Sequence, residues 1–153
     1  MRALGIDFGE RRIGLALSDE EGRFAMPFGT VERSSDRVAV ARIAEIAKRE
    51  GVGRLVLGEP LSPVDGSRGP AAERARRFGE KLTAKTGLPV TLVDEALTTV
   101  EAAERLREAG IDVRRDPSHL DAVAAQILLQ EALDRGPSPL LSEQPPEPEE
   151  EPR

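Results

Sequence analysis

"ALGIDFG", residues 3–9, has the pattern of an apolar strand with a carboxylate inside it. The side chains of Leu4, Ile6 and Phe8 favour the protein interior. An ionised Asp7 away from water costs several kcal/mol unless a partner compensates the charge. Two interpretations are open: Asp7 accepts hydrogen bonds from the backbone of the GERR turn that follows, or Asp7 belongs to a functional site.

Two further strand patterns follow this segment. Residues 11–19, RRIGLALSD, alternate with Ile13, Leu15 and Leu17 on one face, and residues 23–32, RFAMPFGTVE, form a weaker third pattern. The links between the three, FGERR and DEEGR, are short and typical of turns. We therefore predict that the first three strands form an antiparallel meander.

The second half of the chain alternates helices and strands. We predict, in order, a helix from a cap at Ser34 or Ser35 to Gly51, a buried strand at 54–58, a helix from about Pro70 to a Gly87 cap, a strand at 88–95, and helices at 98–110 and 117–134. Such alternation implies parallel strands with helices on both faces of the sheet. The predicted fold class is α/β, with a five-stranded mixed sheet and a functional site at the carboxyl ends of the parallel strands.

Composition limits the class of protein. The chain has 153 residues, of which 39% are hydrophobic, with four Phe, no Trp, no Tyr and no Cys. The lack of Cys excludes disulfides, thiolate metal sites and a Cys nucleophile. The N-terminus has no apolar run typical of a signal peptide, and no stretch has the length of a membrane span. We expect a cytoplasmic protein without a membrane partner.

Residues 136–153 are rich in Pro and Glu and have little to bury, so we predict one domain at residues 1–135 and a disordered acidic tail after it. From Glu143 onward, five glutamates and one arginine carry −4 of the net charge of −6, which leaves −2 for the rest. A domain so close to neutral neither requires nor excludes nucleic acid. Arginine clusters at 11–12, 74–77 and 114–115 fit phosphate contacts or solvated faces equally well.

Two more acids stand where the fold prediction places the site. Glu95 directly follows the fifth strand, and Asp121 lies in the first turn of the last helix, where the same-face residues three, four and seven positions on are apolar. If these acids converge with Asp7, the three cannot all be ionised without a cation. Mg²⁺ or Mn²⁺ takes such oxygen ligands, and two ions about 4 Å apart support attack of water on a phosphodiester.

Each of these acids also has a structural interpretation. Glu95 could be a surface loop residue. Ser118 and Asp121 have the spacing of a capping box, in which the acid bonds back to the start of its own helix. The presence of three such acids together favours the functional interpretation over three separate structural ones.

Four motifs also occur in a set order: GIDFGERRIGLALSD at 5–19, VLGEPLSPVDGSRG at 56–69, VDEALTT at 93–99 and LDAVAAQILLQ at 120–130. In these motifs the chain resembles the YqgF, or RuvX, family of bacterial proteins over about residues 1–134. The resemblance implies an RNase H-like fold and divalent-metal hydrolysis of nucleic acid. It also implies that Asp7, Glu95 and Asp121 are the catalytic and metal-binding acids.

The chain departs from the family pattern at two positions. Ala96 stands where the family has an arginine, which removes a candidate contact to a phosphate or carboxylate. Glu59 stands where the family has an apolar residue, which adds an acid near the site.

Further substrate contacts are predicted near the acids. Arg11 and Arg12 follow Asp7 on the first hairpin, with a solvated turn as the alternative. The turn-rich loop at 63–69 lies on the expected site edge, and its N–H groups and arginine could bind a phosphate, although an ordinary strand-to-helix loop has the same pattern. The residues assigned there are Gly66, Ser67 and Arg68.

Two threonines after the fifth strand and a histidine at the start of the last helix could also contact the substrate or assist the reaction. Thr99 could contact a phosphate, whereas Thr98 and Glu101 have the spacing of a second capping box, which we favour for Thr98. His119 is the only histidine, and it could assist proton transfer or be incidental at a helix start.

The resemblance implies a nuclease that processes the 5′ end of pre-16S rRNA in ribosome biogenesis. Cleavage of branched DNA, as by a Holliday junction resolvase, is an alternative that needs a dimer, and the sequence allows a monomer or a homodimer. A nucleic-acid-binding factor without activity is a second alternative. The GIDFG motif also resembles the phosphate loop of actin-like ATPases, but those proteins enclose the nucleotide between two such domains.

Overall fold

The computed structural model describes residues 1–62, 64–96, 98–112 and 114–135. The strands are β1 (Arg2–Phe8), β2 (Arg12–Ser18), β3 (Ala25–Glu32), β4 (Val52–Glu59) and β5 (Val90–Asp94), and the helices are α1 (Asp36–Arg49), α2 (Pro70–Thr86), α3 (Thr98–Glu108) and α4 (Pro117–Arg135). The predicted order of strands and helices is confirmed. The acidic tail predicted at 136–153 lies outside the described residues.

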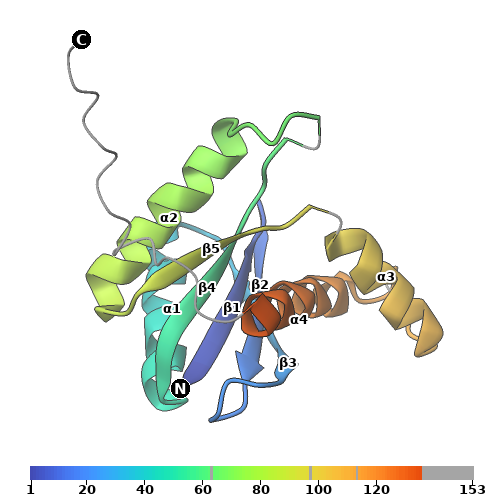
Figure 1. Cartoon of the computed structure of the whole chain (residues 1–153), viewed down its shortest axis with the longest axis horizontal. Coiled ribbons are helices and arrows are strands. Elements are labelled where there is room, and N and C mark those ends of the chain that lie inside the picture. The colour runs from blue at the N-terminus through green and yellow to red at the C-terminus, as the bar shows by residue number, and fades with distance from the viewer. Residues whose placement is uncertain (63, 97, 113, 136–153) are drawn as a thin grey trace.

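The strands form one mixed sheet in the order β3-β2-β1-β4-β5 (Figure 1). β1 to β3 pair antiparallel, and β1, β4 and β5 pair parallel. The prediction of an antiparallel meander followed by parallel strands is therefore confirmed. In this order the carboxyl ends of β1, β4 and β5 meet at one edge of the sheet, next to the start of β2.

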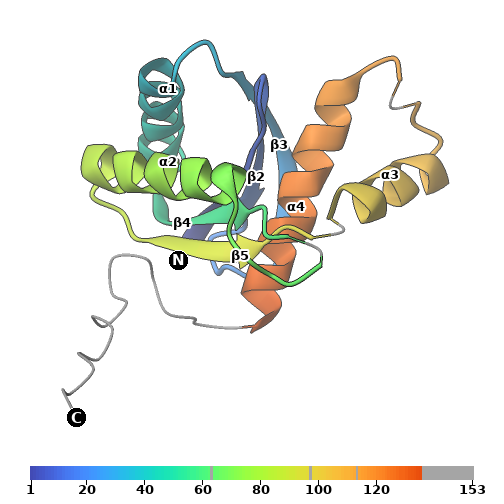
Figure 2. The same cartoon turned by 90° about the horizontal axis from the view of Figure 1, so that it is seen from above.

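The helices divide between the two faces of the sheet, with α1 and α2 on one face and α4 on the other (Figure 2). The first face has a large-residue core in which Ile6, Leu15 and Leu57 pack with Phe78 of α2. The second face is built from small residues, among them Ala3 and Ala16, packed against α4. α3 packs on α4 rather than on the sheet.

Two glycines bring α4 close to the sheet. A Cβ at Gly5 would lie 2.7 Å from Cβ of Leu129, and a Cβ at Gly14 would lie 2.0 Å from the carbonyl oxygen of Asp121. Because side chains alternate along a strand, Asp7 of β1 points to the same face as Gly5, which is the face that α4 covers. The backbone of α4 at Asp121 is therefore fixed beside Asp7. Asp121 is the fifth residue of α4, so its predicted place in the first turn of this helix is wrong.

Local signals explain where the first two helices begin and end. Ser35 caps α1 by accepting a hydrogen bond of 3.2 Å from N–H of Val38. Gly87 ends α2 in the left-handed conformation with φ of 72°, and its N–H donates to the carbonyl of Thr83. Both caps are as predicted. Within the described ranges, no helix has the length and apolar character that crossing a membrane requires.

Candidate active site

The two strand-end acids meet across β4. Asp7 is the second-last residue of β1, and Glu95 directly follows β5. β4 lies between them, and its residue at this level is Gly58, paired with Val93. A Cβ at Gly58 would lie 2.7 Å from Oε2 of Glu95. The side chain of Glu95 therefore occupies the space that the missing side chain of Gly58 leaves.

The carboxyl groups of Asp7 and Glu95 lie close enough that each shifts the pKa of the other. Burial, together with the charge of Asp7, raises the pKa of Glu95 to about 8. Burial also raises the pKa of Asp7, with a smaller contribution from the charge of Asp121. Glu95 is thus protonated at neutral pH in the metal-free protein, and the pair holds one proton where a cation would otherwise compensate two charges.

Asp121 lies beside Asp7 and Glu95, but its carboxylate is paired with Arg12. Its Oδ2 lies 3.1 Å from Nε of Arg12, with which it forms an ion pair. Burial raises the pKa of Asp121, and the neighbouring Arg12 opposes that shift. The capping-box interpretation of Asp121 is wrong, because N–H of Ser118 donates to Oδ1 of Asp116, which takes the capping position instead.

One observation fits a metal ion at this place. Oε2 of Glu95 is buried and has no hydrogen-bond partner, and a buried carboxylate oxygen without a partner is an unsatisfied acceptor that a hard cation would satisfy. Among the residues that the structure describes, however, no three acidic, histidine or cysteine side chains gather closely enough to hold a metal ion. Asp7 and Glu95 are in contact, and the carboxylate of Asp121 is directed to Arg12.

The backbone around Glu95 is held from two sides. Its N–H donates to the carbonyl of Glu59 at 3.2 Å, and its carbonyl accepts from the hydroxyl of Thr98. The prediction that Thr98 caps α3 is wrong, because Thr98 is the first residue of that helix and the hydrogen bond that its hydroxyl makes goes to the carbonyl of Glu95. Sequence reasoning missed this positioning role, as it did the space provided by Gly58.

Glu59, which the sequence placed as an extra acid near the site, is paired with arginines. Its side chain is buried, and it accepts from Nε of Arg76 at 2.6 Å and from Nε of Arg68 at 3.3 Å. The two guanidinium groups compensate its charge, so Glu59 does not add a free acid to the pair of Asp7 and Glu95. Arg68 is still about half exposed at the site edge.

The other predicted contact residues vary in their placement. In the loop before α2, N–H of Gly66 donates to the carbonyl of Ser62 and N–H of Ser67 donates to Oδ1 of Asp65, so these two groups are engaged within the loop. Arg11 and Thr99 are exposed. His119 pairs through Nδ1 with Oδ2 of Asp116 at 3.3 Å and not with Asp121.

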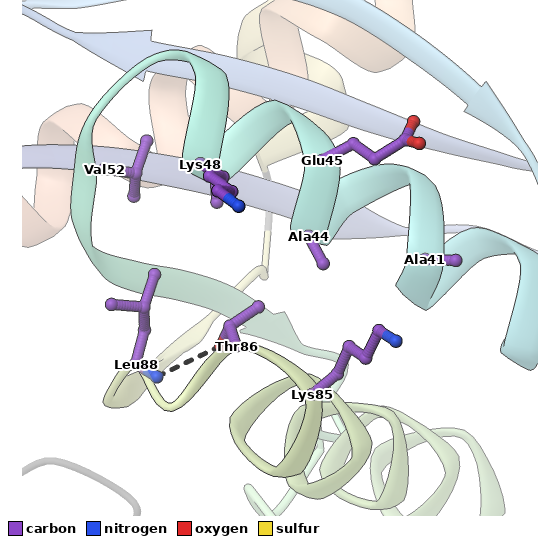
Figure 3. A pocket seen from close by; sticks show the side chains of 9 residues that line it. Ala41, Ala44, Glu45, Lys48, Val52, Lys85, Thr86 and Leu88 are labelled. Atoms are coloured by element: carbon purple, nitrogen blue, oxygen red, sulfur yellow. Dashed lines mark hydrogen bonds between the residues drawn. The ribbon is translucent and has the colours of Figure 1, made fainter.

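Of two cavities, one borders the candidate site and the other does not. One of about 390 Å³ lies beside Arg12, at the β1–β2 turn and the segment before α1. Another of about 490 Å³ lies between the ends of α1 and α2, with Lys48 and Lys85 on opposite sides (Figure 3). This second groove includes Val52 at the start of β4, so it lies at the opposite edge of the sheet and is not part of the candidate site.

The space over Gly58 gives a first prediction. We expect Gly58→Ala to displace the carboxylate of Glu95 and to lower metal affinity and activity at least about tenfold, the lower range for disturbing a group that orients a ligand. Manganese titration and cleavage rates measure the effect. Gly69→Ala is the control, because nothing lies within 4 Å of a Cβ there. Equal rates for both variants would contradict this packing.

The shared proton gives a second prediction. Because the pKa of Glu95 is about 8 in the fold and 4.5 as its ordinary value, the folded state binds more protons between these values. The free energy of unfolding of the metal-free protein should therefore fall as pH rises through this window, by at most about 1.4 kcal/mol per pH unit. Urea unfolding in a chelator measures the slope. Glu95→Gln should flatten it, and an unchanged slope in that variant would contradict the assignment.

Comparison with solved structures defines the class of protein. The chain is similar in fold to a structure of Thermus thermophilus RuvC in complex with Holliday junction substrate. The TM-score is 0.57 at 18% identity, and the match covers 88% of this chain and 94% of that one. A fowlpox virus resolvase with Holliday junction DNA has a TM-score of 0.53 at 10% identity, covering 88% and 98%. The protein therefore has the RuvC-like, RNase H-like α/β fold.

Sequence comparison identifies the family within this class. The family model RuvX, described as Holliday junction resolvase, matches residues 1–135, and the chain belongs to this family. A relative from Anaeromyxobacter dehalogenans, named "Putative pre-16S rRNA nuclease", is 46% identical over 135 residues, covering 88% of this chain and 98% of the relative. A relative of the same name from Chloroflexus aurantiacus is 41% identical over 131 residues, covering 86% and 85%. The family and these relatives make the chain a hydrolase of phosphodiester bonds.

Proposed function

We propose that residues 1–135 form a divalent-metal-dependent nuclease domain in which Asp7, Glu95 and Asp121 are the catalytic and metal-binding residues. The observation that carries this proposal is the close approach of two partly buried carboxyl groups, one with a buried oxygen that lacks a partner, at the edge where the parallel strands end. The proposed cofactor is Mg²⁺ or Mn²⁺, as two ions, because these hard cations take carboxylate oxygens as ligands. Binding by all three acids would need the carboxylate of Asp121 to turn from Arg12.

Bound divalent ions would supply an activated water and charge stabilisation for in-line displacement at phosphorus. The residues of this chain do the rest. Asp7 and Glu95 offer oxygen ligands from the ends of β1 and β5, and Gly58 of the intervening β4 leaves the space that keeps the carboxylates in reach of each other. Exposed side chains at the same edge would orient the sugar–phosphate backbone of the substrate: Arg11, Arg12, Ser67, Arg68 and Thr99.

The substrate proposed is the 5′ region of pre-16S rRNA, in a cytoplasmic protein. This choice is supported by the names of the relatives, which cover almost all of the domain. Branched DNA is the second candidate, supported by the description of the matching family model. A protein with only four Phe and no Trp or Tyr has few residues for base stacking, so contacts to the backbone should dominate with either substrate.

Cleavage of two substrates side by side tests the proposal. A 5′-extended 16S precursor RNA and a four-way DNA junction are incubated with the purified protein and Mg²⁺ or Mn²⁺, with a chelator as control. We expect metal-dependent shortening of the RNA. Paired, symmetric cuts in the junction would favour the second candidate and predict a homodimer. Binding without cleavage of either substrate would contradict a nuclease and favour a binding factor.

A further inference from the structure

The guanidinium of Arg12 is the positive charge paired with Asp121 at the candidate site. Arg12 is the first residue of β2, and the alternation of side chains puts it on the same face as Gly14, under the start of α4. Its Nε lies 3.1 Å from Oδ2 of Asp121, which leaves the third predicted metal ligand paired with a positive charge of the protein itself.

We propose that Arg12 exchanges partners when the site is loaded, an inference that rests on the proposed function. In the metal-free protein, Arg12 holds the carboxylate of Asp121 away from Asp7 and Glu95. When a divalent cation binds to that pair, Asp121 turns to the cation, and the freed guanidinium of Arg12 binds a backbone phosphate of the nucleic acid. Arg12 is thus a positioning residue for Asp121 before it is a substrate contact.

The partial exposure of the ion pair between Arg12 and Asp121 makes the exchange feasible. The side chains of Arg12 and Asp121 are 40% and 30% exposed, and partly exposed ion pairs of this kind are weak. The pair of Glu59 and Arg76 is the opposite case, with side chains 6% and 20% exposed and a shorter contact. Breaking that buried pair would leave an uncompensated charge, whereas Asp121 and Arg12 can each find a new partner of opposite charge.

Only side chains need to move. The carbonyl of Asp121 is packed against Gly14, and the carbonyl of Arg12 accepts from N–H of Gly9 at 3.1 Å, so both backbones are fixed. The cavity of about 390 Å³ beside Arg12 gives its guanidinium room to turn away from Asp121.

Arg33 lines the same cavity, but unlike Arg12 its guanidinium is held by several partners. Its Nε donates to Asp36, its Nη1 donates to the carbonyl of Gly9, and its guanidinium stacks 4.2 Å from the ring centre of Phe8. In the described part of the chain, the side chain of Arg12 makes one ion pair, with Asp121, and Asp116 is a second acid close enough for the charge of Arg12 to lower its pKa. The geometry assigns Arg33 to structure and leaves Arg12 free to exchange.

Manganese titration without nucleic acid tests the exchange through binding alone. Because Arg12 competes with the cation for Asp121, Arg12→Gln should tighten Mn²⁺ binding about 2- to 5-fold, as followed by electron paramagnetic resonance of free Mn²⁺. Arg11→Gln is the matched control, since it removes the same charge one residue away, and should change affinity less than about 2-fold. Arg12→Lys, which keeps a cation, should stay near the wild type.

A purely structural arginine would give a different result. Weaker or unchanged Mn²⁺ binding in Arg12→Gln, or an equal gain in Arg11→Gln, would overturn the exchange. If the wild type binds Mn²⁺ normally in that case, the proposed function survives and only the exchange fails. If the wild type does not bind Mn²⁺ at all, both proposals fail.

Nuclear magnetic resonance provides a second readout that does not depend on affinity. With nitrogen-15 labelled arginine, the Nε–H signal of Arg12 is identified by its loss in Arg12→Lys. Saturation with Mg²⁺ should shift this signal as its acceptor changes, whereas the signal of Arg33 should stay in place. An Arg12 signal that is unchanged by saturating Mg²⁺ would overturn the exchange.

Discussion

Asp7→Asn is expected to lose metal-dependent cleavage by about 1000-fold or more while the protein stays folded. Loss of a metal ligand removes several kcal/mol of stabilisation from the transition state, and each 1.4 kcal/mol is about tenfold in rate. The same substitution removes one of two buried acids in contact, so the metal-free variant should unfold at a higher urea concentration than the wild type near pH 8. Cleavage rates and urea unfolding measure the two effects.

Asp94→Asn is the matched control for this variant. Asp94 precedes Glu95, carries the same charge and is exposed, and its Oδ1 accepts from N–H of Ala96 at 3.0 Å, a bond that asparagine can keep. We expect less than about tenfold loss of rate, since a neighbouring charge acts only through solvent. Equal losses in Asp7→Asn and Asp94→Asn would mean that the acids act through general charge rather than as ligands.

Gly14→Ala is expected to have the largest effect on stability. A Cβ there would lie 2.0 Å from the carbonyl oxygen and 2.4 Å from the carbonyl carbon of Asp121, which are backbone atoms that no side-chain rotation can move. α4 would have to lift from the sheet. We expect a loss of about 3 kcal/mol or more in the free energy of unfolding, with a fall of about 10 °C in Tm, and a loss of activity as Asp121 moves.

Gly69→Ala again serves as the reference for this test. Gly69 has φ of −101°, which other residues adopt readily, and a Cβ there meets open space, so stability should stay within about 1 kcal/mol of the wild type. Thermal unfolding of both variants measures the difference. A Gly14→Ala protein as stable as the Gly69→Ala protein would show that α4 does not seat on β2 as described.

The fold was predictable because its signals are local. Alternation marks the strands, Ser35 and Gly87 mark helix ends, and short turns force the meander. The meeting of Asp7 and Glu95 was also predictable, because the carboxyl ends of the parallel strands of a sheet lie at one edge. These inferences need only chain order and the period of each element.

The site details that were missed depend on contacts between distant segments. Gly58 has meaning only once β4 lies between β1 and β5, and the signal available in the sequence was a glycine before the end of a buried strand. The two arginines on Glu59 come from a loop and from α2 and could not be placed from local pattern.

The alternative interpretation of Ser118 and Asp121 as a capping box and the prediction of a cap at Thr98 failed for one reason. The spacing is satisfied locally, but a competing partner is stronger in each case. Asp116 accepts from N–H of Ser118, which leaves Asp121 to Arg12, and the hydroxyl of Thr98 donates to the carbonyl of Glu95. A local motif identifies which bonds are possible, and the tertiary structure decides which of them form.

We propose above that Asp7, Glu95 and Asp121 bind divalent metal at the carboxyl edge of the sheet. Anomalous diffraction from crystals of the protein soaked in Mn²⁺ tests it most directly. We expect manganese peaks bound by carboxylate oxygens of Asp7 and Glu95, with Asp121 turned from Arg12 toward the metal. Crystals that bind Mn²⁺ elsewhere, or that leave Asp7 and Glu95 without metal at a concentration that supports cleavage, would contradict it.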